Sequence, residues 1–108
     1  MITQMNLKQM FLGTITAGTT TVYSVNSSVS SAVIKELVAY NNGTEPVDFQ
    51  LAINDIQLIG QTIDAGDSLF SDKTWYLVFK PGDVVTITTD KDNVNVLIVG
   101  AETVAASN

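Results

Sequence analysis

Two close pairs of aspartates are the residues of this 108-residue chain whose type and spacing could do chemistry. Asp64 and Asp67 form one pair, and Asp90 and Asp92 form the other. A catalytic carboxylate pair must face a substrate bond from two sides, and one member needs a raised pKa. Both pairs lie in segments typical of turns, where the aspartate side chain bonds the local backbone. We therefore interpret all four as solvated turn residues, and we expect no catalytic residue.

Metal and cofactor chemistry is equally poorly supported. The chain contains neither histidine nor cysteine, which removes imidazole and thiolate groups as nucleophiles or metal ligands. Calcium could use turn carboxylates, but the segment 90–95 has no glycine at loop position six and no glutamate at position twelve. The serine-rich segment 24–31 has no base that would activate a hydroxyl. We expect no enzymatic activity, no cofactor and no metal site, with calcium left as the open alternative.

Asp83 follows a corner of the sequence Lys80-Pro81-Gly82, and related corners occur at 14–19 and 62–67. Each places Ala or Pro before Gly, which predicts a type II-like turn with positive φ at the glycine. The first corner has Thr19 where the other two have aspartate. A catalytic carboxylate would not recur in this way, so we interpret Asp83 as a turn residue that caps backbone N–H groups.

The rest of the chain is dominated by sequence patterns typical of β-strands, and these strands must position the turns. The clearest is 47–54, where apolar residues alternate with polar ones, and Asn54-Asp55 then predicts a two-residue hairpin turn. The segment 84–89 alternates again, with Val85 and Ile87 expected inward. Further strands are expected over 19–25, 32–40, 56–63, 75–79 and 94–100, and Asn41-Asn42-Gly43 predicts a turn after the second of these. Their spacing predicts an all-β fold, an antiparallel β-sandwich or jelly-roll-like barrel of about eight short strands.

The two ends of the chain differ from this pattern. Residues 1–12 are expected to form an N-terminal arm or a leading strand, residues 13–102 the β-sandwich domain, and residues 103–108 a polar tail. Met5, Leu7, Met10 and Phe11 are the candidate protein-interaction residues, because flexible Met-rich segments suit adaptable contacts. Packing of the same residues in the core is the alternative.

The amino-acid composition limits the classes of partner that the chain could bind. Only 15% of the residues are charged, against roughly 25% in typical domains, and the net charge is −6. An acidic chain is unsuited to nucleic-acid backbones and to anionic membranes. No window approaches the 18 apolar residues of a membrane span, and the N-terminus is unlike a signal peptide. We expect no nucleic-acid or membrane partner, and synthesis in a cytoplasm.

The aromatic residues of the chain leave carbohydrate binding as a possible function. Trp75, Tyr76, Tyr40 and Phe49 could form a stacking platform for sugars on a β-sandwich. Trp75 lies within a continuous apolar run, however, which favours a core or interface position.

Five segments follow one another in an order and spacing that are typical of a known family. They are "TITAGTTTVYSV", "IKELVAYNNGTEPVDFQLAIND", "IQLIGQTIDAGDSL", "WYLVFKPGDVVTITTD" and "DNVNVLIVGAE". Through these segments, over roughly residues 13–102, the chain resembles small β-sandwich virion proteins of tailed bacteriophages, of the head-decoration or neck and tail accessory type. The segment "MITQMNLKQMF" lies outside the resemblance.

The resemblance implies a non-enzymatic structural protein, expected to be a capsid (head) decoration protein that assembles as symmetric copies. Its partners would be other virion proteins, the major capsid protein or a neck or tail protein, and it would reside in the virion after synthesis in the host bacterial cytoplasm. A neck or tail accessory, or a carbohydrate-binding module of a host-recognition device, is the alternative.

Overall fold

The computed structural model describes residues 3–29, 31–71 and 77–105, which form nine β-strands and no helix within these ranges. The predicted all-β class is confirmed. The strands are β1 (Thr3–Ile15), β2 (Gly18–Ser24), β3 (Ser31–Asn41), β4 (Val47–Ile53), β5 (Ile56–Ile63), β6 (Ser68–Ser71), β7 (Leu77–Phe79), β8 (Val84–Thr89) and β9 (Val94–Ala105). The described part of the chain has no helix that could span a membrane.

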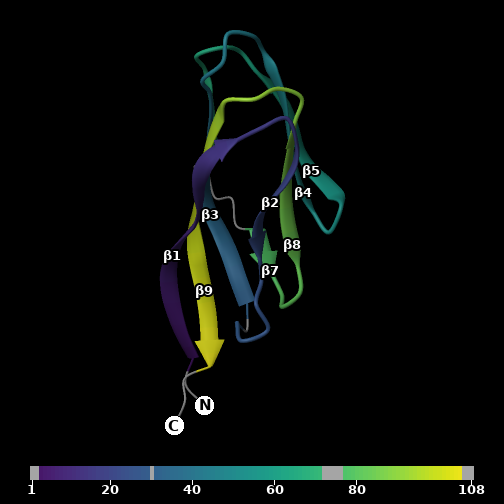
Figure 1. The fold of residues 1–108 in the computed structure, drawn as a ribbon. Helices are drawn as coiled ribbons and strands as arrows, with labels where there is room; N and C mark the ends of the chain where they lie inside the picture. The colour runs from purple at the N-terminus through teal and green to yellow at the C-terminus, as the bar shows by residue number, and fades with distance from the viewer. Residues whose placement is uncertain (1–2, 30, 72–76, 106–108) are drawn as a thin grey trace.

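The strands form two antiparallel sheets that face each other (Figure 1). The first sheet has the order β1-β9-β3-β6, with β7 also paired to β3, and the second has the order β2-β8-β4-β5. The pairs are nested, since β1 pairs with β9, β2 with β8, β3 with β6 and β7, and β4 with β5. This is a long hairpin rolled into a two-sheet jelly roll. The predicted sandwich is thus confirmed, with jelly-roll topology.

The core lies between the sheets and is built from alternate residues of the central strands. On β8, Val85 and Ile87 are fully buried, as expected, while Thr86 between them is only half-buried. On β4, Val47, Phe49 and Leu51 are fully buried. The first sheet contributes Ile34 and Leu37 from β3 and Val94, Val96 and Ile98 from β9. Burial of this alternating pattern fixes the register, because a one-residue slip would turn each strand inside out.

The predicted corners have the expected backbone. The glycines at all three lie at positive φ, at 113° for Gly18, 79° for Gly66 and 90° for Gly82. Asn54 and Asp55 have φ values of 52° and 66°, which is the left-handed pair that a two-residue hairpin turn requires. These corners therefore position the polar side chains at the ends of the sandwich.

The expected boundaries at residues 12 and 102 fall inside strands β1 and β9. β1 begins at Thr3 and pairs with β9 from Thr3↔Ala105 to Ile15↔Val94. Residues 103–105, expected in the polar tail, therefore belong to β9. The sequence of β1 does not alternate regularly between apolar and polar residues, because a bulge between Gln9 and Phe11 inserts Met10 as an extra residue. Of the run expected over 75–79, β7 contains residues 77–79, and 75–76 lie outside the described residues.

Candidate functional site

Asp90 and Asp92 accept hydrogen bonds from the backbone of neighbouring segments. Asp90 Oδ1 accepts the N–H of Asp48 at 2.8 Å, and this hydrogen bond lowers the pKa of Asp90. Asp92 Oδ1 accepts the N–H of Ala17 at 2.7 Å, which connects the β8–β9 turn to the β1–β2 corner. Both carboxylates are exposed. Asp90 therefore ties the β8–β9 turn to the start of β4, and Asp92 ties it to the β1–β2 corner.

Asp64 and Asp67 lie exposed in the β5–β6 corner, where the N–H of Asp67 donates to the carbonyl of Asp64. Across the described ranges, no group of three or more acidic side chains is placed to hold a metal ion. Asp64 and Asp67 are thus turn residues, as their sequence context indicated.

Asp83 is largely buried, and its carboxylate accepts three hydrogen bonds. Its Oδ2 accepts the backbone N–H of Lys80 at 3.0 Å, while Oδ1 accepts Asn54 Nδ2 at 2.9 Å and Lys80 Nζ at 3.0 Å. These bonds, the backbone one first, lower the pKa of Asp83 to about 2. The Asn54 side chain also accepts the N–H of Val84 at 2.9 Å. Asp83 thus caps a turn, as expected, and also ties this corner to the β4–β5 hairpin.

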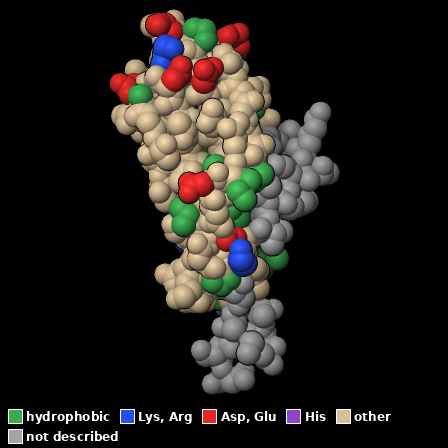
Figure 2. Space-filling view, turned by 90° about the vertical axis from the view of Figure 1, so that its right-hand side faces the viewer, with side chains coloured by type: hydrophobic (Ala, Val, Ile, Leu, Met, Phe, Trp, Pro, Cys, Tyr) green, Lys and Arg blue, Asp and Glu red, His purple; other side chains and the backbone are tan. Residues whose placement is uncertain are grey.

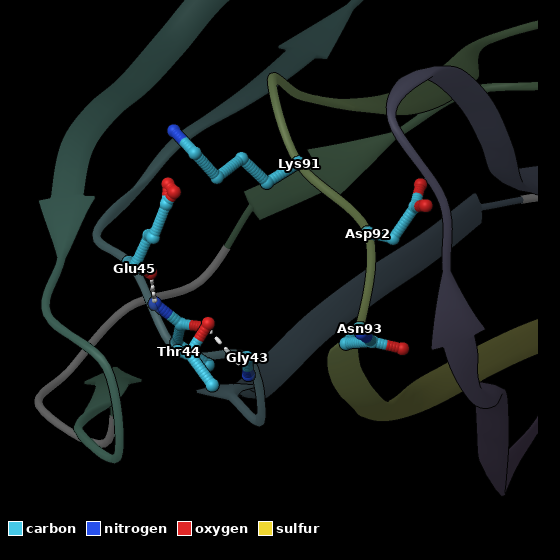
Figure 3. Close-up of a pocket in the computed structure, with 7 residues that line it drawn as sticks. Gly43, Thr44, Glu45, Lys91, Asp92 and Asn93 are labelled. Atoms are coloured by element: carbon cyan, nitrogen blue, oxygen red, sulfur yellow. Dashed lines mark hydrogen bonds between the residues drawn. The ribbon is translucent and has the colours of Figure 1, made fainter.

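A polar hollow of about 170 Å³ lies at one end of the sandwich, between the β3–β4 loop and the β8–β9 turn (Figure 3). It is lined by Asn41, Gly43, Thr44, Glu45, Lys91, Asp92 and Asn93. In the close-up, the Glu45 and Lys91 side chains extend to the same side, whereas Asp92 points away toward the β1–β2 corner. The hollow is therefore formed by two hydrogen-bonded loops, without a convergent set of reactive groups.

Asn41 holds this end together and was not singled out by its sequence context. It is 1% exposed, and its Nδ2 donates to the carbonyls of Glu45 and Ile63 at 2.7 and 2.9 Å. Its Oδ1 accepts the N–H of Gly43 at 2.9 Å. One amide thus joins the end of β3 to the following loop and to the end of β5.

The structure describes two of the four aromatic residues considered for a sugar platform. Phe49 is fully buried in the core, so it offers no face to a ligand. Tyr40 is half-buried on β3. Trp75 and Tyr76 lie outside the described residues.

The four candidate interaction residues separate into two pairs along β1. Met10 is 9% exposed in the core, and Phe11 packs partly buried against it. Met5 and Leu7 are 64% and 78% exposed. The bulge at Met10 produces this division, because it changes which residues of β1 face inward.

An apolar row crosses the outer face of the first sheet, and it is the strongest candidate for a functional surface. Leu12, Leu97, Val38 and Phe70 are cross-strand neighbours in consecutive pairs on β1, β9, β3 and β6. Leu12 and Phe70 are 65% and 53% exposed, and the two central residues are half-buried. A shallow hollow of about 160 Å³ adjoins the row and is lined by Leu12, Val38, Tyr40, Asn95, Val96 and Leu97. We call these four residues the apolar row.

The outer face of the second sheet has the opposite character. Thr19, Thr88, Gln50 and Gly60 are neighbours across its four strands. The view from the side of β4, β5 and β8 is correspondingly dominated by uncharged polar side chains and backbone, with acidic side chains gathered at one end (Figure 2). The row of neighbours across the second sheet is therefore polar, whereas the row across the first sheet is apolar.

No protein-family model and no curated protein sequence matches this chain. Similar solved structures come from the Bacillus endospore appendages described as disulfide-linked pili, with 14% identity, 98% of this chain and 88% of that chain covered, and a TM-score of 0.51. The Drosophila NLP core, described in terms of pentamer formation and histone binding, has 19% identity, 91% and 100% coverage and a TM-score of 0.53.

Dimeric latent PorU from Porphyromonas gingivalis is also similar in structure, with 13% identity and a TM-score of 0.52. The match covers 94% of this chain but 13% of the PorU chain. At these identities the similarities show a shared β-rich fold.

Proposed function

We propose that this protein is a non-enzymatic structural protein of a tailed-bacteriophage virion, a capsid decoration protein that assembles as symmetric copies on the particle. It would be synthesised in the host cytoplasm and would bind the major capsid protein. The observation that carries the proposal is the apolar row on the outer face of the first sheet of an acidic jelly roll.

The apolar row is unfavourable in a free, monomeric chain. Leu12 and Phe70 each leave more than half of their surface in water, and each Å² of apolar surface removed from water contributes roughly 25 cal/mol. A contiguous apolar surface with a polar surround marks an interaction site. A partner that covered the row would gain this burial.

Charge favours contact through the same surface. The chain carries a net charge of −6, and its copies repel one another at long range. The four residues of the row are uncharged, so a partner that touched their side chains would desolvate no charge at these positions.

The fold supports the same proposal. Jelly rolls recur in viral capsid and lectin domains. The ordered corners, with positive φ at Gly18, Gly66 and Gly82, belong to the segments that resemble phage virion proteins. Two structures with a similar fold are described in terms of pili and of pentamer formation, which is in keeping with assembly from copies.

Quantitative mass spectrometry of purified particles tests the proposal. A decoration protein is expected in copy numbers comparable to those of the major capsid protein. A low copy number would instead indicate the neck or tail accessory role. Absence from particles that contain all their other structural proteins would overturn the proposal.

A further inference from the structure

β1 presents a long free edge. It is the end strand of the first sheet and has 13 residues, whereas the other end strands, β2, β5 and β6, have 7, 8 and 4. At about 3.4 Å per residue, β1 extends for about 44 Å. It pairs with β9 on one side, and no described strand lies on its other side (Figure 1). Such an edge exposes backbone N–H and C=O groups that can pair with another strand.

β1 lacks most of the features that prevent edge pairing. It contains no proline, and Lys8 is its one charged residue. Lys8 Nζ is bound within its own chain, at 3.1 Å from Glu102 Oε2 and 5.9 Å from the centre of the Tyr23 ring. Its charge is therefore already engaged by the chain that carries it. The bulge at Met10 divides the strand into two halves but leaves both paired to β9.

The exposed side chains of the two halves lie on the same face. Leu7 pairs with Ala101 of β9, and Leu12 pairs with Leu97. These partners are four residues apart on one strand, and residues at even spacing share a face. Leu7 and Leu12 are five residues apart, and the extra residue Met10 brings them to that common face.

We propose that β1 pairs antiparallel with β1 of a second copy of this chain, with Leu7 of each copy opposite Leu12 of the other. This inference deepens the proposed function and rests on its claim that copies assemble. It joins the two first sheets into one continuous sheet, and the apolar rows of both copies then lie on the same face.

A second copy fits this edge because the pairing is self-complementary. A two-fold axis between residues 9 and 10 places each half of β1 against the other half, so the same surface serves both copies. In this register Lys8 lies opposite Phe11 of the second copy, and the two Lys8 charges stay apart. The exposed leucines form two cross-strand apolar pairs, an arrangement that stabilises antiparallel sheets.

Disulfide trapping tests this register, since the chain has no native cysteine. In the double variant L7C/L12C, each introduced thiol faces one from the second copy. Opposite Cα atoms of antiparallel strands are about 4.5–5.5 Å apart, which a disulfide can bridge. We expect mild oxidation to give a covalent dimer that reductant dissociates. The single variants L7C and L12C are expected to remain uncrosslinked, because their own copies lie about five residues apart along the paired strands.

The double variant I56C/Q61C is the matched control. Its two positions are also five residues apart and exposed, on β5, the end strand of the second sheet. We expect no covalent dimer from it under the same oxidation. Circular dichroism before oxidation verifies that all variants are folded, and sedimentation velocity of the unmodified chain is expected to show a dimer.

The pairing of β1 is overturned if L7C/L12C gives no more covalent dimer than the control, or if the single variants crosslink equally well. It is also overturned if the unmodified chain sediments as a monomer at all concentrations. A dimer of the unmodified chain without the crosslink would place the interface elsewhere and leave assembly intact. Absence of the chain from particles would count against the proposed function alone, because crosslinking is measured on the purified chain.

Discussion

Replacing Asn41 by alanine is expected to lower the free energy of unfolding by about 3 kcal/mol. The buried side chain makes three hydrogen bonds, to the carbonyls of Glu45 and Ile63 and from the N–H of Gly43. Each such bond contributes about 1 kcal/mol net, and more where a buried partner is left unsatisfied. About 1 kcal/mol moves the melting temperature of a domain near this size by about 4 °C or more, so we expect a decrease of at least about 12 °C.

The near-isosteric variant Asn41→Asp separates hydrogen bonding from packing. It retains an acceptor for the N–H of Gly43, but it places a carboxylate oxygen against the carbonyls of Glu45 and Ile63, where the native amide donates. We expect it to be at least as destabilising as the alanine variant at neutral pH, because a buried charge then faces two acceptors.

Urea denaturation followed by circular dichroism measures both variants, with Asn42→Ala as the control. Asn42 is the adjacent residue and is exposed, and its backbone N–H bond to Asn93 does not depend on its side chain. We expect the control to change stability by less than about 0.5 kcal/mol. Equal effects of alanine at positions 41 and 42, or an aspartate variant as stable as the native chain, would refute the role assigned to the Asn41 amide.

Three further predictions concern the interactions that hold the sandwich. The pKa of Asp83 is about 2 in the folded chain, below its ordinary 3.8, so its contribution to stability is present above about pH 3.8 and is lost as the pH falls through 2. In urea titrations, Asp83→Asn should therefore lose less free energy of unfolding than the native chain over that pH range, and an equal loss would contradict the prediction. Gly100→Ala should cost about 3 kcal/mol or more, because the added Cβ would lie 1.9 Å from the carbonyl oxygen of Val33; a thermal melt like that of the native chain would disprove the close approach. Tyr23→Phe should raise the pKa of Glu102, whose lowering comes first from the Tyr23 hydrogen bond; carbon-13 titration of the carboxyl would show no change if that bond were absent.

The strands with one buried face were predictable because their pattern is local. β4 and β8 alternate along a few consecutive residues, and the Asn54-Asp55 turn requires nothing beyond its two residues. β1 was harder to predict, because the extra residue at Met10 interrupts its alternation and makes Met5 and Leu7 differ in burial from Met10 and Phe11. Its partner β9 lies at the opposite end of the chain, where no local signal indicates the pairing.

The apolar row could not be found from the sequence. Leu12, Leu97, Val38 and Phe70 come from four strands, and only the registers of three strand pairs bring them together. Each residue alone is typical of a buried strand position. Asn41 illustrates the same limit, since Asn41-Asn42-Gly43 correctly indicated a turn, while the bond to Ile63 depends on a strand 22 residues away.

Co-sedimentation of the purified chain with particles that lack it tests most directly whether the apolar row attaches this protein to a virion. The variants to compare are Leu97→Asp, at the centre of the apolar row, and Thr88→Asp, which is also half-buried and lies on the opposite sheet. With folding verified by circular dichroism, we predict that the native chain and Thr88→Asp sediment with the particles and that Leu97→Asp stays in solution. Retention of Leu97→Asp on the particles, or failure of the native chain to bind them, would contradict the account.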